Sequence, residues 1–173
     1  MKKHFKCLIG LALAACGAVS AFAFDAKVTS VTGKVQVQKK GSSEWIDLSK
    51  GDLVEEGAII STGFNSNATL RLGESVCTIA PLTRMSVEQL TRKDVEGTDK
   101  NVTKTTVYID TGKASFKVNS TSKNLNDFKV HTPASTASVR GTAFDSYAGG
   151  ETVVTEGLVG MSVGESREAV EGM

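Results

Sequence analysis

Cysteine, histidine and aromatic residues are scarce in this sequence, and their scarcity excludes several kinds of site. The 173 residues include three Cys, two His, one Trp, two Tyr and seven Phe. After the first 23 residues a single cysteine, Cys77, and a single histidine, His131, remain. One cysteine cannot close an internal disulfide, and no group of residues has the spacing of a zinc site. We therefore expect no catalytic residue, no metal site and no cofactor.

Both of these residues are predicted to be structural. Cys77 lies in the strand-like stretch Ser-Val-Cys-Thr-Ile, where a small buried side chain is expected. No neighbouring cationic residue would lower the pKa of its thiol. His131 lacks an identifiable nucleophile and orienting acid, so we expect a hydrogen-bonded or exposed histidine and not a general base.

A basic patch and a second long apolar run are also missing. After residue 23 there are 17 basic and 19 acidic residues, and no basic stripe with interleaved aromatic residues occurs. Nucleic acid is therefore not an expected partner. No apolar run of the ~20 residues needed to span a membrane follows residue 25, so we expect no transmembrane helix in the mature chain.

Residues 1–23 have the three parts of a secretory signal peptide. Lysines occupy positions 2, 3 and 6, an apolar stretch runs from Leu8 to Val19, and Ala21-Phe22-Ala23 forms a small-x-small cleavage site. The mature protein is therefore expected in the periplasm or cell envelope.

The same leader contains a second processing signal. Leu13-Ala14-Ala15-Cys16 resembles a bacterial lipobox, in which Cys16 would be lipidated and become the first residue. Residues 18–24 are apolar, however, whereas a lipoprotein usually has a polar tether there. Both interpretations remain open at this point, and both export the chain.

After Asp25 the sequence predicts an all-β fold. It is rich in Gly, Val, Thr and Ser, and turn signals recur about every ten residues. Short segments alternate apolar and polar residues, as half-buried strands do. The clearest are Lys34–Gln38, Thr69–Leu72, Val107–Asp110 and Phe128–His131.

Polar composition predicts two loops, Arg92–Asn101 and Asn119–Asp127. Residues 164–173 are acidic and are interpreted as a tail or a last strand. Three glycines, Gly33, Gly112 and Gly157, each precede an alternating segment. Glycine permits the positive φ that a tight reversal or bulge needs, so each is predicted to form a hairpin corner.

Several motifs in fixed order resemble one known family. The early ones are Gly33-Lys34-Val35, Trp45–Leu48 with Gly51-Asp52-Leu53, Gly57–Gly63, Ser66–Leu72 and Gly112–Phe116. The most specific stretch runs through Phe128–Ala134, Ser138–Phe144 and Thr152–Val159. Together they resemble a FecR domain over most of residues 26–163. Ser61 and the turn Leu72–Ser75 depart from the usual pattern, as surface variation does.

The resemblance implies an all-β domain of short strands with solenoid-like or sandwich stacking, and periodicity alone does not separate the two. Well-known members are membrane-bound regulators of iron uptake, whose FecR domain senses a transporter from the periplasm. This sequence shows neither their cytoplasmic part nor their spanning helix. The family motif, structural or interacting, falls on Thr132, Pro133, Val139, Arg140, Gly141, Thr142, Phe144 and Gly157.

Arg140 has two interpretations. Its planar guanidinium could bind a carboxylate of a partner. Alternatively, Gly141 forms a bulge and Arg140 pairs internally with Asp145 or Glu156, in which case Arg140→Ala lowers the melting temperature by several degrees. We favour the internal pair. Trp45 is expected to pack in the core or on a hairpin, beside Ile46 and Leu48.

Three functions follow. The first is a non-enzymatic protein-interaction or sensory module of the envelope, in which an exposed strand edge or face recruits another envelope protein. The second is a module that binds peptidoglycan or another glycan through a shallow cleft with exposed aromatic residues. The third, an enzyme, is the least supported.

Overall fold

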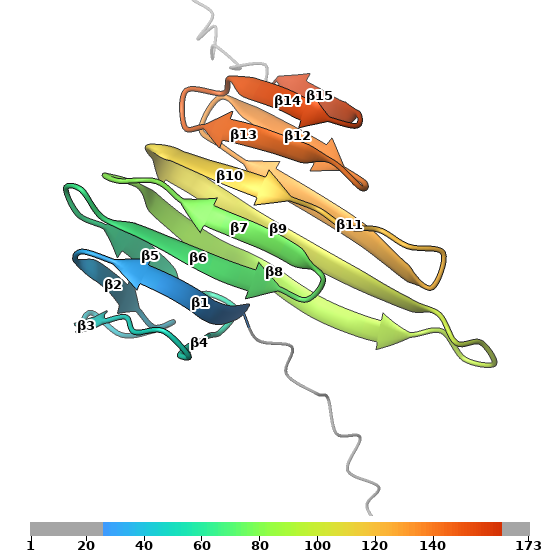
Figure 1. The fold of residues 1–173 in the computed structure, drawn as a ribbon, viewed down its shortest axis with the longest axis horizontal. Helices are drawn as coiled ribbons and strands as arrows, with labels where there is room; N and C mark the ends of the chain where they lie inside the picture. The colour runs from blue at the N-terminus through green and yellow to red at the C-terminus, as the bar shows by residue number, and fades with distance from the viewer. Residues whose placement is uncertain (1–25, 164–173) are drawn as a thin grey trace, which may run out of the picture.

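The computed structural model describes residues 26–163, and these residues form two β-sheets packed face to face with no helix between them (Figure 1). The all-β prediction is confirmed, and the architecture is sandwich-like. The predicted leader, with both of its predicted processing signals, and residues 164–173 lie outside the described part of the chain. Within 26–163 no helix is long and apolar enough to cross a membrane.

One sheet has seven strands and the other has eight. The seven-stranded sheet has the order β14 (Thr152–Glu156), β13 (Ala143–Tyr147), β10 (Lys113–Lys117), β7 (Ser75–Ile79), β6 (Asn67–Leu72), β1 (Ala26–Thr32) and β4 (Leu53–Val54). The eight-stranded sheet has the order β15 (Val159–Val163), β12 (Ser135–Val139), β11 (Asn124–His131), β9 (Asn101–Thr111), β8 (Arg84–Asp94), β5 (Ile59–Thr62), β2 (Val35–Gln38) and β3 (Trp45–Asp47).

The chain path combines both predicted kinds of stacking. It crosses repeatedly from one sheet to the other, so both sheets grow in the same direction from the first strands to the last (Figure 1). The strands therefore accumulate as in a solenoid, while the core is that of a sandwich. As in repeat proteins, this leaves the sandwich with two ends, each formed by the edge strands of both sheets, and each end needs a cover.

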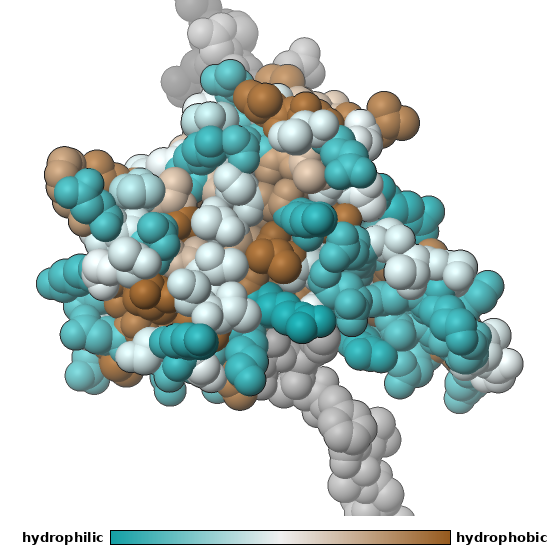
Figure 2. All heavy atoms as spheres, viewed as in Figure 1, coloured by the Kyte–Doolittle hydropathy of each residue, from teal (hydrophilic) through white to brown (hydrophobic). Residues whose placement is uncertain are grey.

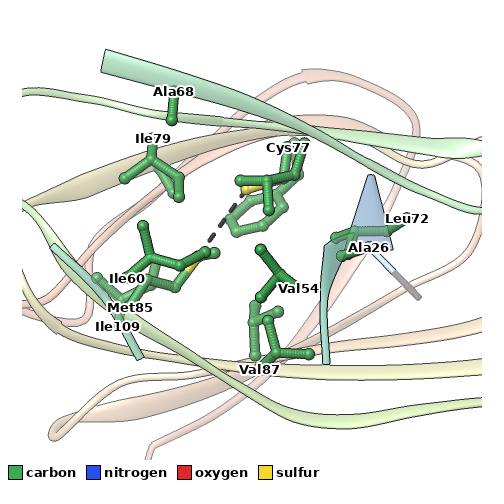
Figure 3. Packing of buried hydrophobic residues seen from close by; sticks show 14 of the residues in the cluster. Ala26, Val54, Ile60, Ala68, Leu72, Cys77, Ile79, Met85, Val87 and Ile109 are labelled. Atoms are coloured by element: carbon green, nitrogen blue, oxygen red, sulfur yellow. Dashed lines mark hydrogen bonds between the residues drawn. The ribbon is translucent and has the colours of Figure 1, made fainter. Parts of the chain in front are cut away.

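The core lies between the two sheets because alternate side chains of each strand point inward. In Figure 3, Ile60, Ile79, Met85 and Ile109 pack around Cys77, whose Sγ lies 3.9 Å from Met85 Sδ. Cys77 is fully buried, and burial raises the pKa of its thiol. The prediction that Cys77 packs in the core is confirmed.

The three predicted glycine corners all have positive φ, but they are crossings between sheets and not hairpins. Gly33 (φ 72°) joins β1 to β2, Gly112 (φ 84°) joins β9 to β10, and Gly157 (φ 89°) joins β14 to β15. Each packs against a buried hydroxyl group of a neighbouring crossing, from Ser66, Thr83 and Thr142 respectively. These contacts hold adjacent corners together.

The two predicted polar loops are shorter than expected. Only residues 95–100 and 118–123 lie between strands, because β8 continues to Asp94, β9 begins at Asn101 and β11 begins at Asn124. A strand ladder is held by backbone hydrogen bonds, which do not require apolar side chains. β8, β9 and β11 extend here as a polar arm beyond the facing sheet (Figures 1 and 2).

Candidate interaction site at the last strands

The residues of the sequence motif fall at two opposite ends of β12. Thr132 and Pro133 form the hairpin between β11 and β12, where Thr132 Oγ1 accepts the backbone N–H of Ser135 at 2.9 Å. The remaining motif residues gather at the other end of β12, around the crossing to β13. Thr132 and Pro133 therefore shape a turn and do not share a site with the others.

The crossing from β12 to β13 is locked to the crossing from β14 to β15. Gly141 has φ 67°, and Thr142 Oγ1 donates a hydrogen bond to the backbone oxygen of Leu158 at 2.9 Å. A Cβ atom on Gly157 would lie 2.9 Å from the Gly141 carbonyl oxygen, so glycine is needed there. Val139 and Phe144, on either side, are buried in the core. The motif thus builds a rigid corner.

Arg140 does not make the internal ion pair that the sequence suggested. Asp145 pairs with Lys113 instead, with 2.7 Å between Asp145 Oδ2 and Lys113 Nζ. Arg140 itself is exposed and makes no ion pair within residues 26–163. Gly141 sends β13 into the other sheet, where Asp145 lies beside β10. The guanidinium of Arg140 is left at the corner, free to contact solvent or a partner.

We therefore expect Arg140→Ala to leave stability almost unchanged, within about 0.5 kcal/mol, as for surface positions without special contacts. Thermal unfolding followed by circular dichroism measures this directly. A drop of several degrees in the melting temperature would restore a structural role for Arg140.

The pair formed by Lys113 and Asp145 is the main electrostatic feature beside the motif. Burial acts to raise the pKa of Asp145, but hydrogen bonds from Lys113 and Ser115 and the charge of Lys113 outweigh it, so the pKa is lowered. The hydrogen bond to Asp145 raises the pKa of Lys113, as does its contact with Tyr147. Both shifts favour the charged pair.

Stability should therefore depend on Asp145 in acid. Because its pKa is lower in the folded state, its contribution is present above the unfolded value of about 3.9 and is lost as the pH falls through the folded value. We expect the melting temperature of Asp145→Asn to lie below wild type at pH 7 and to converge with it near pH 2. A difference that is constant with pH would contradict this account of the pair.

The most exposed apolar surface lies at the C-terminal end of the sandwich, which is formed by the edge strands β14 and β15. Large apolar side chains are exposed here, including Leu158 (87 %), Val163 (78 %) and Met161 (46 %), together with Val153 and Val154. Figure 2 shows hydrophobic residues gathered at the top of the molecule, where Figure 1 places these strands. The opposite end, formed by β3 and β4, has shorter strands of three and two residues. Ile46 and Leu53 are exposed there, but Leu48 and Val54 are buried near them.

The register shows that part of this apolar surface is uncovered core. Met161 pairs with Ala137 and Val154 pairs with Phe144, and both of these neighbours are buried. Since cross-strand neighbours share a face, Met161 and Val154 point inward, between the sheets. Across residues 26–163, β14 pairs only with β13 and β15 only with β12, so each also has a free hydrogen-bonding edge.

A shallow depression, open to solvent, adjoins this end. Its lining includes Asp127, Val139, Arg140 and Leu158. The rigid corner therefore places a cation beside the exposed apolar residues. Sequence reasoning identified Arg140 but missed the apolar end, although the alternation of Val159, Met161 and Val163 was a visible signal.

The other residues singled out in the sequence lie elsewhere. His131 Nδ1 is 3.2 Å from Glu88 Oε2, a partly exposed contact between β11 and β8. Trp45 is half-buried on β3, with the Arg84 guanidinium 5.4 Å from its ring centroid. In the described part of the chain, no three or more His, Cys, Asp or Glu side chains come together as metal ligands.

Comparison with known proteins gives one match. The model of the family described as FecR protein matches residues 58–160, which extend from just before β5 into β15. No curated protein matches, and no solved structure matches. Because the match covers more than half of the 173 residues, the chain belongs to the FecR family.

Proposed function

We propose that this chain is an exported, non-enzymatic protein-interaction module of the bacterial cell envelope, with a sensory or regulatory role. Its binding site is the open C-terminal end of the sandwich, formed by β14, β15 and the adjoining Arg140 corner. A protein partner adds a strand to this end. The family supports a regulatory module, and the export signals in residues 1–23 support the location.

The observation that carries the proposal is the coincidence of two unmet requirements at one end. An edge strand presents backbone N–H and C=O groups that readily pair with another strand. Val154 and Met161 are inward-facing apolar side chains. Removing such side chains from water is favourable, by about 25 cal/mol per Å² of apolar surface buried. A strand from a partner meets both requirements at once.

Glycan binding has less support from this structure. Glycan sites of the expected kind need exposed aromatic rings in a cleft. Phe116, Phe128 and Phe144 are buried, and the Arg84 guanidinium lies over the Trp45 ring. Phe64 is exposed but does not line the depression beside Arg140. The depression beside Arg140 is lined by six residues, none of them aromatic. We therefore favour a protein partner over a glycan.

Affinity capture from native envelope fractions tests this function. The full-length chain, exported through its own leader, carries a tag beside Gly97 in the exposed β8–β9 loop, far along the polar arm from the site. Wild type should retain a specific protein partner, an untagged copy of the chain included, and Met161→Lys should lose it.

Leu53→Lys is the matched control, because it introduces the same charge at an exposed apolar residue of the opposite end. It should capture the partner as wild type does. Recovery of cell-wall fragments alone, or equal capture by Met161→Lys, would overturn the proposed function.

A further inference from the structure

We infer that the partner of the open C-terminal end is a second copy of this chain, joined by antiparallel pairing of β15 with its own counterpart about a two-fold axis at Met161. The inference rests on the proposed function, since both assign binding to the same end. It adds the identity of the partner and the register of the contact.

The sequence of β15 is self-complementary. Read around Met161, Val159 lies opposite Val163 of the second copy, and Gly160 lies opposite Ser162 of the second copy. Apolar residues thus meet apolar residues, and small residues meet small ones. An antiparallel pair centred on a residue also places opposite side chains on the same face, as a sheet requires. A two-fold axis produces such pairing automatically.

The direction of the side chains fits a continuous core. Val159, Met161 and Val163 pair with Val139, Ala137 and Ser135, all buried, so the three point between the sheets. Across the two-fold axis, this inner row meets the same row of the second copy. The eight-stranded sheets of the two molecules then continue into one another, and Met161 and Val154 leave solvent.

Charge favours this occupant over the chain's own C-terminal segment. β15 contains no charged residue, so self-pairing opposes no like charges. Residues 164–173 contain three Glu and one Arg, and only Ala169, Val170 and Met173 are apolar. That composition suits the uncharged strand β15 poorly. In the proposed dimer Val163 and its counterpart lie about 13 Å apart along the paired strands, because four residues separate them.

Sedimentation equilibrium of the purified exported chain measures the mass of the assembly. Wild type should have twice the mass of one chain, Met161→Lys should have the mass of one chain, and Leu53→Lys should remain dimeric. Met161→Lys should still unfold cooperatively near the wild-type temperature, because residue 161 is already partly exposed.

Oxidative cross-linking tests the register. Met161→Cys should form a covalent dimer, since the two-fold axis brings the two residues 161 face to face, whereas Leu53→Cys should not. Cys77 should not react in either variant, because it is buried.

The outcomes separate this inference from the proposed function. A monomeric wild type that still captures a different envelope protein through Met161 would overturn the second copy and leave the function standing. A monomer with no capture that depends on Met161 would overturn both. A dimer that persists in Met161→Lys, or in which Met161→Cys fails to cross-link, would overturn pairing through β15.

Discussion

Gly112→Ala is expected to lower the free energy of unfolding by about 2–5 kcal/mol, because it combines backbone strain with overpacking. Gly112 has φ 84°, a conformation that L-residues with a side chain rarely adopt. An added Cβ would lie 2.4 Å from Thr83 Oγ1 and 2.7 Å from the backbone oxygen of Leu82. The second contact is with backbone, so no rotamer change relieves it.

The same substitution disturbs the bond that joins two crossings. Thr83 Oγ1 accepts the N–H of Lys113 and donates to the Lys113 carbonyl oxygen, each at 3.0 Å. Displacing this buried hydroxyl would remove the acceptor of the Lys113 N–H, which adds to the cost, whereas the Lys113 carbonyl oxygen would keep the N–H of Ala80 at 3.0 Å. The attachment of the crossing from β9 to β10 to the crossing from β7 to β8 would then be weakened.

Urea unfolding of Gly112→Ala and Gly97→Ala separates the two causes. Gly97 also has positive φ, at 74°, but a Cβ there would meet nothing within 4 Å. Gly97→Ala should therefore cost only the strain, about 1–2 kcal/mol. Equal losses in the two variants would show that the contact with Thr83 and Leu82 is unimportant.

Phe116→Ala is expected to cost about 3–5 kcal/mol, which corresponds to a fall of roughly 6–20 °C in the melting temperature. Phe116, only 3 % exposed, is the central ring of three. It stacks on Phe144 with 5.1 Å between centroids and meets Phe128 edge-on at 5.4 Å. Its removal leaves a cavity between the two sheets and breaks both aromatic contacts.

Thermal unfolding with Phe64→Ala as the control checks this expectation. Phe64 is 76 % exposed on the crossing from β5 to β6, so the same truncation should change stability by less than about 0.5 kcal/mol. If Phe116→Ala were equally mild, the three rings would not hold the sheets together as described.

The local features of this fold could be read from the sequence. Alternation identified strands such as Phe128–His131 because one face of each is buried. The positive φ of Gly33, Gly112 and Gly157 was predicted because it is a local property of glycine, but the hairpins predicted there are crossings between sheets. Cys77 was placed in the core by its apolar neighbours alone.

What the sequence could not supply was the pairing of distant strands. Asp145 seemed a natural partner for Arg140, five residues away, but the chain changes sheets between them and brings Lys113 to Asp145 from β10. The apolar end was missed for the same reason. The alternation of β15 resembles that of an inner strand, and its exposure depends on its place at the end of the sheet.

The central claim is that the open C-terminal end binds a protein in the envelope, and photo-cross-linking inside cells tests it most directly. A photoreactive amino acid is placed at position 161 or, for comparison, at the exposed position 53 of the opposite end. The account predicts a discrete protein adduct from position 161 and none from position 53. No adduct from position 161, or the same adduct from both, would contradict it.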